Sequence, residues 1–230
     1  MTTVQATAPH ALVTGASSGI GEAISRLLLS RGWRVTGLSR RRPRIDDPGF
    51  EHRAADLSSP RSLLDATENL SVQAFVHAAG LMSTNPLGHL EAEAGMAMWQ
   101  LHVQAASILA DRLLDGMGPG GRIILIGSRT ATGAAGRSQY AATKAALNGL
   151  ARSWAAELAP RGITVNLVSP AATDTPMLND PSRVSSAPRI PPIGRLIRPE
   201  EVAGTVAFLL SGDAAAITGQ NIVICGGSSL

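Results

Sequence analysis

The sequence predicts a single α/β domain built on a doubly wound parallel sheet. Short apolar runs alternate along the chain with longer stretches of helical periodicity, and these runs are continuous instead of alternating with polar residues. Strands of that kind are covered by helices on both faces, which is typical of parallel sheets. The 230 residues, 44% of them hydrophobic, are enough for one well-buried core, so we expect one domain over residues 1–230.

The first half of the chain is expected to form four strands and two helices before a longer third helix. An apolar run predicts a strand at 10–14, and apolar residues spaced by three and four predict a helix at 20–30. Strands follow at 33–38, 51–54 and 72–77. Between the last two, Ser59-Pro60 predicts the start of a helix that runs to Asn69, because proline suits the first helical turn. A long apolar helix is expected at 91–116, with Gly95 as its candidate break.

The second half continues this alternation. The strand at 122–126 is apolar after Arg122, and Pro160 and Gly162 close the helix at 139–158. A strand at 163–168 precedes a proline-rich irregular stretch at 175–199, which is followed by a helix at 199–210 and a last strand at 221–224. Ligands of such a sheet bind beyond the carboxyl ends of the strands, so the turns after the strands are the expected site.

Composition excludes several classes of protein. The single cysteine, Cys225, rules out an internal disulfide and a cysteine-based zinc site, and the five histidines show no ligand spacing, so no metal is expected. The sequence shows neither a signal peptide nor a run of about 18 apolar residues, so we expect a cytoplasmic protein without a membrane partner. The net charge of +3 is small and not striped along one helix, which argues against a nucleic-acid partner.

A glycine-rich turn follows the first predicted strand and leads into the first predicted helix. It reads Thr14-Gly15-Ala16-Ser17-Ser18-Gly19-Ile20-Gly21, with the spacing G-x-x-x-G-x-G. Glycines let the backbone approach a pyrophosphate, which N–H groups at the positive end of the helix bind. An ordinary strand-to-helix turn is the alternative. The place of this glycine-rich turn after the first strand favours a dinucleotide site. The expected contacts come from Gly15, Ser17, Ser18, Gly19, Ile20 and Gly21.

The end of the second predicted strand bears on which dinucleotide binds. NAD sites place an acidic residue there, whereas this chain has Ser39-Arg40-Arg41 and no acid before Asp46. An Arg pairs with a 2′-phosphate through charge-assisted bonds. We therefore expect Ser39 and Arg40 to select NADP(H), with NAD(H) as the alternative cofactor and a solvated basic loop as the alternative explanation of the arginines.

The only tyrosine and the only lysine of the chain lie four residues apart, in Tyr140-Ala-Ala-Thr-Lys144 at the start of a predicted helix. Residues at this spacing share a helix face. A nearby Lys cation and the positive end of the helix both favour a phenolate, so Tyr140 is a candidate general acid or base for a hydroxyl or carbonyl group. An exposed pair without chemistry is the alternative explanation.

Taken together, these motifs resemble those of the short-chain dehydrogenase/reductase family, over nearly the whole chain. The resemblance rests on Thr14-Gly15-x-x-x-Gly19-x-Gly21, Asp56-Leu57, His77-Ala78-Ala79-Gly80, Ile126-Gly127-Ser128, Tyr140-x-x-x-Lys144, Ser169-Pro170 and Thr175-Pro176-Met177, in the family's order. It implies a Rossmann-like fold and hydride transfer between NADP(H) and a carbonyl or alcohol substrate.

The resemblance also implies a role for each matching residue. Tyr140 would exchange the proton of the substrate oxygen, Ser128 would polarise that oxygen, and Lys144 would lower the phenol pKa and hold the nicotinamide ribose. Asp56 and Leu57 would flank the adenine, although helix capping competes as an explanation of Asp56. Further cofactor contacts are implied for Ala78, Ala79, Gly80, Pro170, Ala171, Thr173 and Thr175.

The chain departs from the family at four positions. His77-Ala78 stands where the family has two asparagines, and we expect His77 to be structural. The fourth catalytic member of the family is an Asn in the long helix, and our alignment places Gln104 there. Ala171 follows Pro170 where the family has Gly. Because Ser128, Tyr140 and Lys144 are all present, we expect an active enzyme. The alternative is a cofactor-binding sensor or scaffold without turnover.

Substrate and assembly are less constrained. The irregular stretch at 176–198 is expected to form a flap over the pocket, since long loops in compact domains are often lids. Its apolar residues and its arginines, Arg183, Arg189 and Arg195, permit a hydrophobic carbonyl compound or an acyl thioester. The resemblance further implies a homotetramer or a homodimer.

Overall fold

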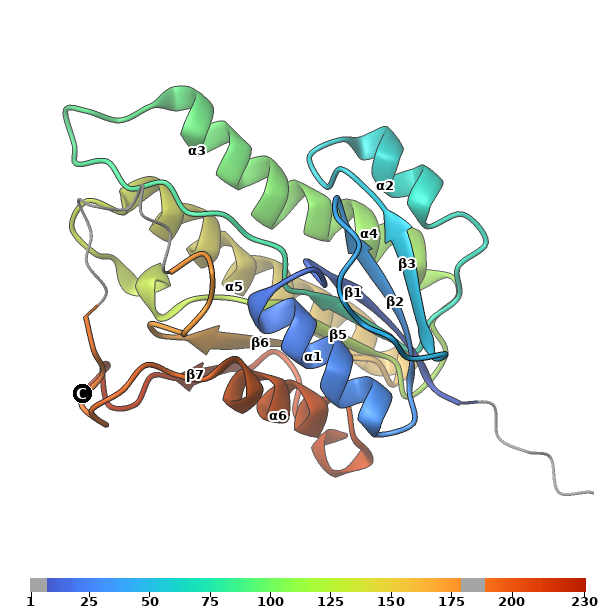
Figure 1. The fold of residues 1–230 in the computed structure, drawn as a ribbon. Helices are drawn as coiled ribbons and strands as arrows, with labels where there is room; N and C mark the ends of the chain where they lie inside the picture. The colour runs from blue at the N-terminus through green and yellow to red at the C-terminus, as the bar shows by residue number, and fades with distance from the viewer. Residues whose placement is uncertain (1–7, 179–188) are drawn as a thin grey trace, which may run out of the picture.

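The computed structural model describes residues 8–178 and 189–230, and these form one seven-stranded parallel sheet (Figure 1). The strand order is β3-β2-β1-β4-β5-β6-β7. The strands are β1 (His10–Thr14), β2 (Arg34–Ser39), β3 (Phe50–Ala54), β4 (Ala74–His77), β5 (Arg122–Ile126), β6 (Thr164–Pro170) and β7 (Asn221–Ile224). The predicted doubly wound α/β sheet is confirmed. The order reverses between β1 and β4, where ligands of such sheets bind.

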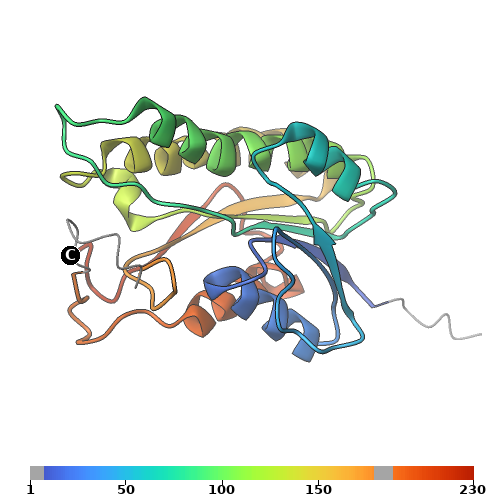
Figure 2. The ribbon, with the colours of Figure 1, turned by 45° about the horizontal axis from the view of Figure 1, so that its top comes forward.

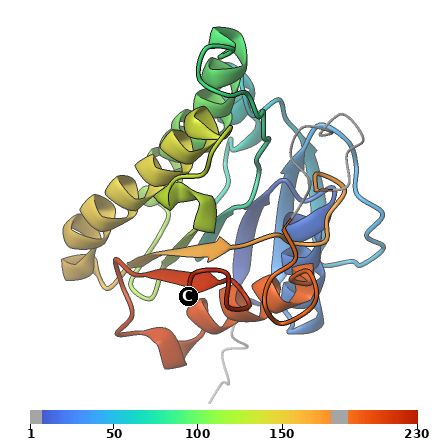
Figure 3. The same ribbon diagram turned by 90° about the vertical axis from the view of Figure 1, so that its left-hand side faces the viewer.

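Helices cover both faces of the sheet. They are α1 (Gly19–Ser30), α2 (Pro60–Ala66), α3 (Ala92–Trp99), α4 (Ala105–Leu114), α5 (Ser138–Leu158) and α6 (Pro199–Leu209). Helices α1 and α6 lie on one face and α2 to α5 on the other (Figure 2). A perpendicular view shows α1 and α6 side by side (Figure 3). Within the described residues, no helix is long and apolar enough to cross a membrane.

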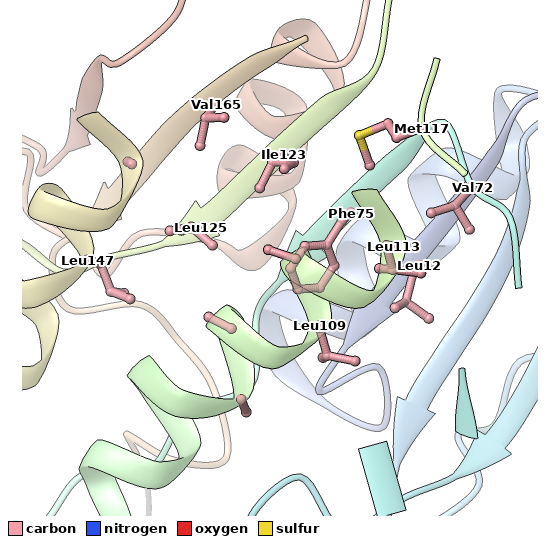
Figure 4. Packing of buried hydrophobic residues seen from close by; sticks show 14 of the residues in the cluster. Leu12, Val72, Phe75, Leu109, Leu113, Met117, Ile123, Leu125, Leu147 and Val165 are labelled. Carbon is pink, nitrogen blue, oxygen red and sulfur yellow. The ribbon is translucent and has the colours of Figure 1, made fainter. Parts of the chain in front are cut away.

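Each face of the sheet has its own hydrophobic core, because successive strand residues point to opposite faces. On the face of α4 and α5, Leu12, Phe75 and Leu125 pack against Leu109 and Leu147 (Figure 4). The neighbouring strand residues, which include Ala11, Val13, Val76 and Ile124, pack on the opposite face against α1 and α6. Strands β1, β2, β4, β5 and β6 are therefore buried on both sides, which explains their mostly apolar sequence, whereas the edge strands β3 and β7 are partly exposed.

Helix ends follow local capping. Ser59 is the N-cap of α2 and accepts a hydrogen bond from the Ser62 amide, and Pro60 takes the first turn as predicted. The helix ends at Ala66 and not at Asn69, because the Thr67 hydroxyl bonds back to the Leu63 carbonyl and Asn69 takes a left-handed φ of 53°.

The helix expected at 91–116 is interrupted, but not at Gly95. Its two α-helical parts, α3 and α4, are joined by η1, a π-helical segment at Gln100–Gln104 in which the Ala105 amide donates to the Gln100 carbonyl. Gly95 lies inside α3, where a Cβ would overlap the Gln139 side chain, so close packing against α5 explains this glycine. Wide turns of the π type often occur at functional sites.

Candidate active site

Two connected hollows lie beyond the carboxyl ends of the strands. One is a cavity of about 470 Å³ over β5 and β6, and the other is a groove of about 390 Å³ beside the glycine turn. Residues shared by both walls are Ile20, Ala78, Gly80, Leu81, Thr175 and Met177. The two hollows therefore form one continuous site across the switch point of the sheet.

The glycine turn is shaped by close backbone contacts. Gly15 has φ +69°, and a Cβ there would lie 2.9 Å from the backbone of Ala79. Gly21 leaves no room for a Cβ beside the Gly15 carbonyl. Ser18 is the N-cap of α1, but its side chain makes no capping hydrogen bond. The first amides of α1 thus point toward the groove without a side-chain cap, as an anion-binding helix end requires.

Charged groups line the far end of the groove. The exposed side chains of Arg40 and Arg41 stand there with the carboxylate of Asp56. Asp56 accepts hydrogen bonds from the amide and hydroxyl of Ser58, and these bonds, together with the charge of Arg40, lower the pKa of Asp56. Asp56 is not the cap of α2, since Ser59 is. Arg41, which was not among the predicted cofactor residues, also lines the groove.

Ser128, Tyr140 and Lys144 line the same wall of the cavity. Ser128 lies two residues after the end of β5 and caps a short 3₁₀ turn, η2 (Arg129–Thr132), by accepting a hydrogen bond of 3.1 Å from the Thr130 amide. Ser128 therefore caps this turn and lines the cavity as well. Tyr140 and Lys144 come from the first turns of α5, and both are buried.

The ammonium group of Lys144 is enclosed by protein. Its Nζ donates a hydrogen bond of 2.8 Å to the carbonyl of Ile126, at the end of β5. Burial lowers the pKa of Lys144 to about 7. Its charge is therefore lost as the pH rises through the neutral range, because removal from water penalises the charged form.

His102, and not Gln104, lies beside Tyr140. Gln104 is exposed and lines neither hollow, so the alignment that placed it in the site is wrong. The His102 ring packs edge-on against the Tyr140 ring with centroids 5.7 Å apart. Spacing along the helix could have identified it, because His102 continues the buried stripe of Met98, Ala106, Leu109 and Leu113, whereas Gln104 is out of phase.

The hydrogen bonds of His102 define its tautomer. The Leu81 amide donates to Nε2 at 3.1 Å, so the ring proton lies on Nδ1. Nδ1 lies 2.8 Å from the Thr143 hydroxyl, which in turn donates to the Tyr140 carbonyl. Burial, followed by the charge of Lys144, holds the pKa of His102 well below its usual range. A neutral imidazole therefore fixes the first turn of α5 to the π-helical segment.

His77 has the structural role that the sequence predicted. The Thr14 hydroxyl accepts from the amides of Ala78 and Ala79, so its proton points to His77 Nδ1 at 3.0 Å. The other ring nitrogen, Nε2, then donates to the Leu101 carbonyl at 3.0 Å. The imidazole links β1, β4 and the π-helical segment, and burial lowers its pKa to about 3.

We expect the replacement His77→Asn to make the free energy of unfolding less dependent on pH at acidic pH. The pKa of His77 in the folded protein lies below the ordinary 6.5, so between about pH 6.5 and 3 the unfolded chain binds a proton at His77 that the folded protein does not. The free energy of unfolding therefore decreases as the pH falls through this range. Loss of this one group should reduce the pH dependence of the unfolding free energy by about 1.4 kcal/mol per pH unit in that range. Urea unfolding at several pH values measures it. The exposed His89→Asn is the control, and equal slopes in wild type and His77→Asn would contradict the assignment.

All predicted cofactor residues line the groove or the cavity, and Thr175 lines both. The side chain of Thr175 also lies close to the glycine turn, since a Cβ added to Gly19 would lie 3.1 Å from it. The roles of these residues remain predictions. Of the predicted flap, residues 179–188 lie outside the described residues, while Met177, Leu178, Arg189, Ile190 and Pro192 line the cavity. Arg129 and Arg137, which the sequence did not single out, line it too.

Comparisons with known proteins agree on one family. Residues 15–229 match the family model described as enoyl-(acyl carrier protein) reductase. The 3-oxoacyl-[acyl-carrier-protein] reductase FabG of Vibrio cholerae is 37% identical over 94% of this chain and 96% of its own. A short chain dehydrogenase of Burkholderia cenocepacia solved with NADP is 30% identical, with a TM-score of 0.85 over 96% of this chain and 98% of its own. A short chain dehydrogenase family protein of Francisella tularensis is 25% identical, with a TM-score of 0.89 over 97% of this chain and 99% of its own. This chain belongs to the short-chain dehydrogenase/reductase family.

Proposed function

We propose that this protein is an NADP(H)-dependent oxidoreductase that interconverts a carbonyl compound and a secondary alcohol. One observation carries the proposal: the wall with Ser128, Tyr140 and Lys144 opens directly into the groove of the glycine turn. A reducible substrate in the cavity and a dinucleotide in the groove would meet at the residues that the two hollows share. The bound nicotinamide would supply or accept the hydride.

The side chains of the cavity supply the proton chemistry. The oxygen of Ser128 accepts the Thr130 amide, which leaves the hydroxyl proton to bind a substrate oxygen. Tyr140 is the proton donor during reduction and the acceptor during oxidation. Lys144 holds positive charge behind the site below about pH 7, where it favours the phenolate form of Tyr140. Thr143 and His102 fix the backbone of Tyr140.

The groove fits a dinucleotide. Gly15, Gly19 and Gly21 stand where side chains would fill the space or strain the backbone, and the uncapped amides of α1 suit a pyrophosphate. Arg40 and Arg41 stand at the end expected for the adenine ribose, where they would pair with a 2′-phosphate. The Burkholderia cenocepacia relative solved with NADP supports the same cofactor.

The relative from Vibrio cholerae supports a thioester as one candidate substrate, since its name describes reduction of a 3-oxoacyl group on a carrier protein. The apolar cavity wall of Ile20, Leu81, Met82 and Leu178 accommodates an acyl chain. A panel of ketones, oxo acids and acetoacetyl thioesters, assayed with NADPH and NADH, tests the proposal. Absence of oxidation of both cofactors with every compound would overturn it.

We expect Arg40→Asp to shift cofactor preference toward NADH. The change removes charge-assisted hydrogen bonds to a 2′-phosphate, worth about 1.5–3 kcal/mol each, and adds a repelling carboxylate. The ratio of kcat/KM for NADPH to that for NADH should fall by about 10- to 100-fold. Arg42→Asp makes the same change of charge outside the groove and should leave the ratio unaltered. An unchanged ratio in Arg40→Asp would refute this role for Arg40.

Assembly is proposed on the same grounds. Met96 and Trp99 on α3 are 58% and 45% exposed, which suits a helix-to-helix contact between copies of the chain. We propose a homodimer or homotetramer formed through this helix layer, and light scattering of the purified protein measures its mass.

A further inference from the structure

The charged side chains of the cavity beside Tyr140 are of one sign. Among the described residues that line it, those with charged side chains are Arg129, Arg137, Lys144 and Arg189, and no aspartate or glutamate side chain lines it. The arginines come from three separate segments: the turn after β5, the residue before α5, and the stretch before α6. A positive wall built from separated segments concentrates anions in the hollow that it surrounds.

Arg129 is the best-defined member of this set. It follows Ser128 directly, at the first position of η2, and the turn is fixed by the cap from Ser128 and by the buried Thr130. The guanidinium is half-buried, and its hydrogen bond to the Ser228 carbonyl is long, at 3.5 Å. Within residues 8–178 and 189–230, no carboxylate forms an ion pair with Arg129.

Such an environment favours an anionic partner. A guanidinium carries five donors, and in a partly enclosed cavity a charge-assisted pair with an oxyanion is stronger than at the open surface. The partner is not the phosphate of a dinucleotide in the groove, since Arg129 lines only the cavity whereas Arg40 and Arg41 line the groove. The partner must therefore belong to the molecule that Ser128 and Tyr140 act on.

We propose that Arg129 binds an anionic group of the substrate, so that the substrate is a carbonyl compound with an apolar skeleton and a carboxylate or phosphate. This inference rests on the proposed function and deepens it. Ser128 and Arg129 are neighbours in the chain, so one short segment binds both the reacting oxygen and the charged group. Arg137 and Arg189 add positive charge to the same cavity.

Matched substrate pairs test the inference. The 2-, 3- and 4-oxohexanoates against their methyl esters report on a carboxylate, and acetoacetyl-coenzyme A against acetoacetyl-N-acetylcysteamine reports on a phosphate. Wild type should favour the charged member of one pair type by about 10- to 100-fold in kcat/KM. Arg129→Met should lose that preference, mainly through KM, because the contact is made equally before and during reaction. Arg129→Lys should retain part of it, and the exposed Arg152→Met should retain all of it.

Two results would overturn the inference: a wild type that uses neutral and charged members equally, or an Arg129→Met variant that weakens both equally. A binding experiment distinguishes failure of this inference from failure of the proposed function. Calorimetric titration of hexanoate, hexyl phosphate and 1-hexanol into the protein with NADP⁺ needs no turnover. Wild type should bind the two anions at least about 10-fold more tightly than the alcohol, and Arg129→Met should show no such preference. Equal binding of all three refutes the inference, whether or not the protein turns over.

Discussion

Replacement of Tyr140 by Phe is expected to lower kcat/KM by about 10²- to 10⁴-fold with every carbonyl substrate that the protein reduces. The change removes the proton donor and keeps the aromatic ring that packs against His102. Because the backbone bond from Thr143 also remains, the fold should be intact. Steady-state oxidation of NADPH measures the effect.

Cofactor binding serves as the control for this variant. Fluorescence titration of NADPH should give Kd values for wild type and Tyr140→Phe within a few-fold of one another, because the groove is unchanged. If the variant reduced its substrates at the wild-type rate, proton transfer by Tyr140 would be excluded. If wild type bound NADPH but oxidised it with no compound, a sensor or scaffold without turnover would replace the enzyme as the explanation.

Gly21→Ala should have the largest effect on stability and on cofactor binding. A Cβ at this position would lie 2.7 Å from the carbonyl carbon of Gly15 and 3.0 Å from the oxygen of Thr14. Both are backbone atoms of the turn, which cannot move without displacing β1 or the start of α1. We expect a loss of about 3 kcal/mol, which for a chain of this size lowers Tm by about 6–12 °C, and a cofactor affinity weaker by more than about 10-fold.

The same substitution elsewhere provides the control. Gly149 lies exposed in α5, and a Cβ there meets nothing within 4 Å. Gly149→Ala should therefore raise stability by about 0.5–1 kcal/mol, since alanine has the higher helix propensity. Thermal unfolding of both variants measures the contrast. A Gly21→Ala variant as stable as wild type would show that the turn tolerates a side chain, against the close contact described above.

Periodicity and end signals were enough to predict the seven strands and the approximate place of each helix, but not the break in the helix expected at 91–116. Continuous apolar strands identified a sheet buried on both faces, and Ser59-Pro60 marked the start of α2 correctly. The π-helical segment could not be predicted in this way, because a wide turn depends on contacts from elsewhere, here the His77 side chain on the Leu101 carbonyl. The break was therefore expected at Gly95, the only local signal available.

The candidate site shows the same division. Ser128, Tyr140 and Lys144 stand in recognisable motifs, and the structure places them on one cavity wall. Gln104 was placed in the site by alignment with the family's asparagine, whereas the helical phase of the buried stripe points to His102. The arginines of the cavity come from separate segments, so no spacing in the sequence reveals that they face one hollow.

The enclosure of Lys144 has a practical consequence. It is the only lysine among 230 residues, so the chain carries a single ε-amine, and that amine lies in the candidate active site. With its pKa lowered to about 7, its uncharged form is populated at neutral pH, where ordinary lysines are almost wholly protonated. Reductive methylation with ¹³C-formaldehyde would therefore place one side-chain NMR label in the protein, at the point where cofactor and substrate are expected to meet.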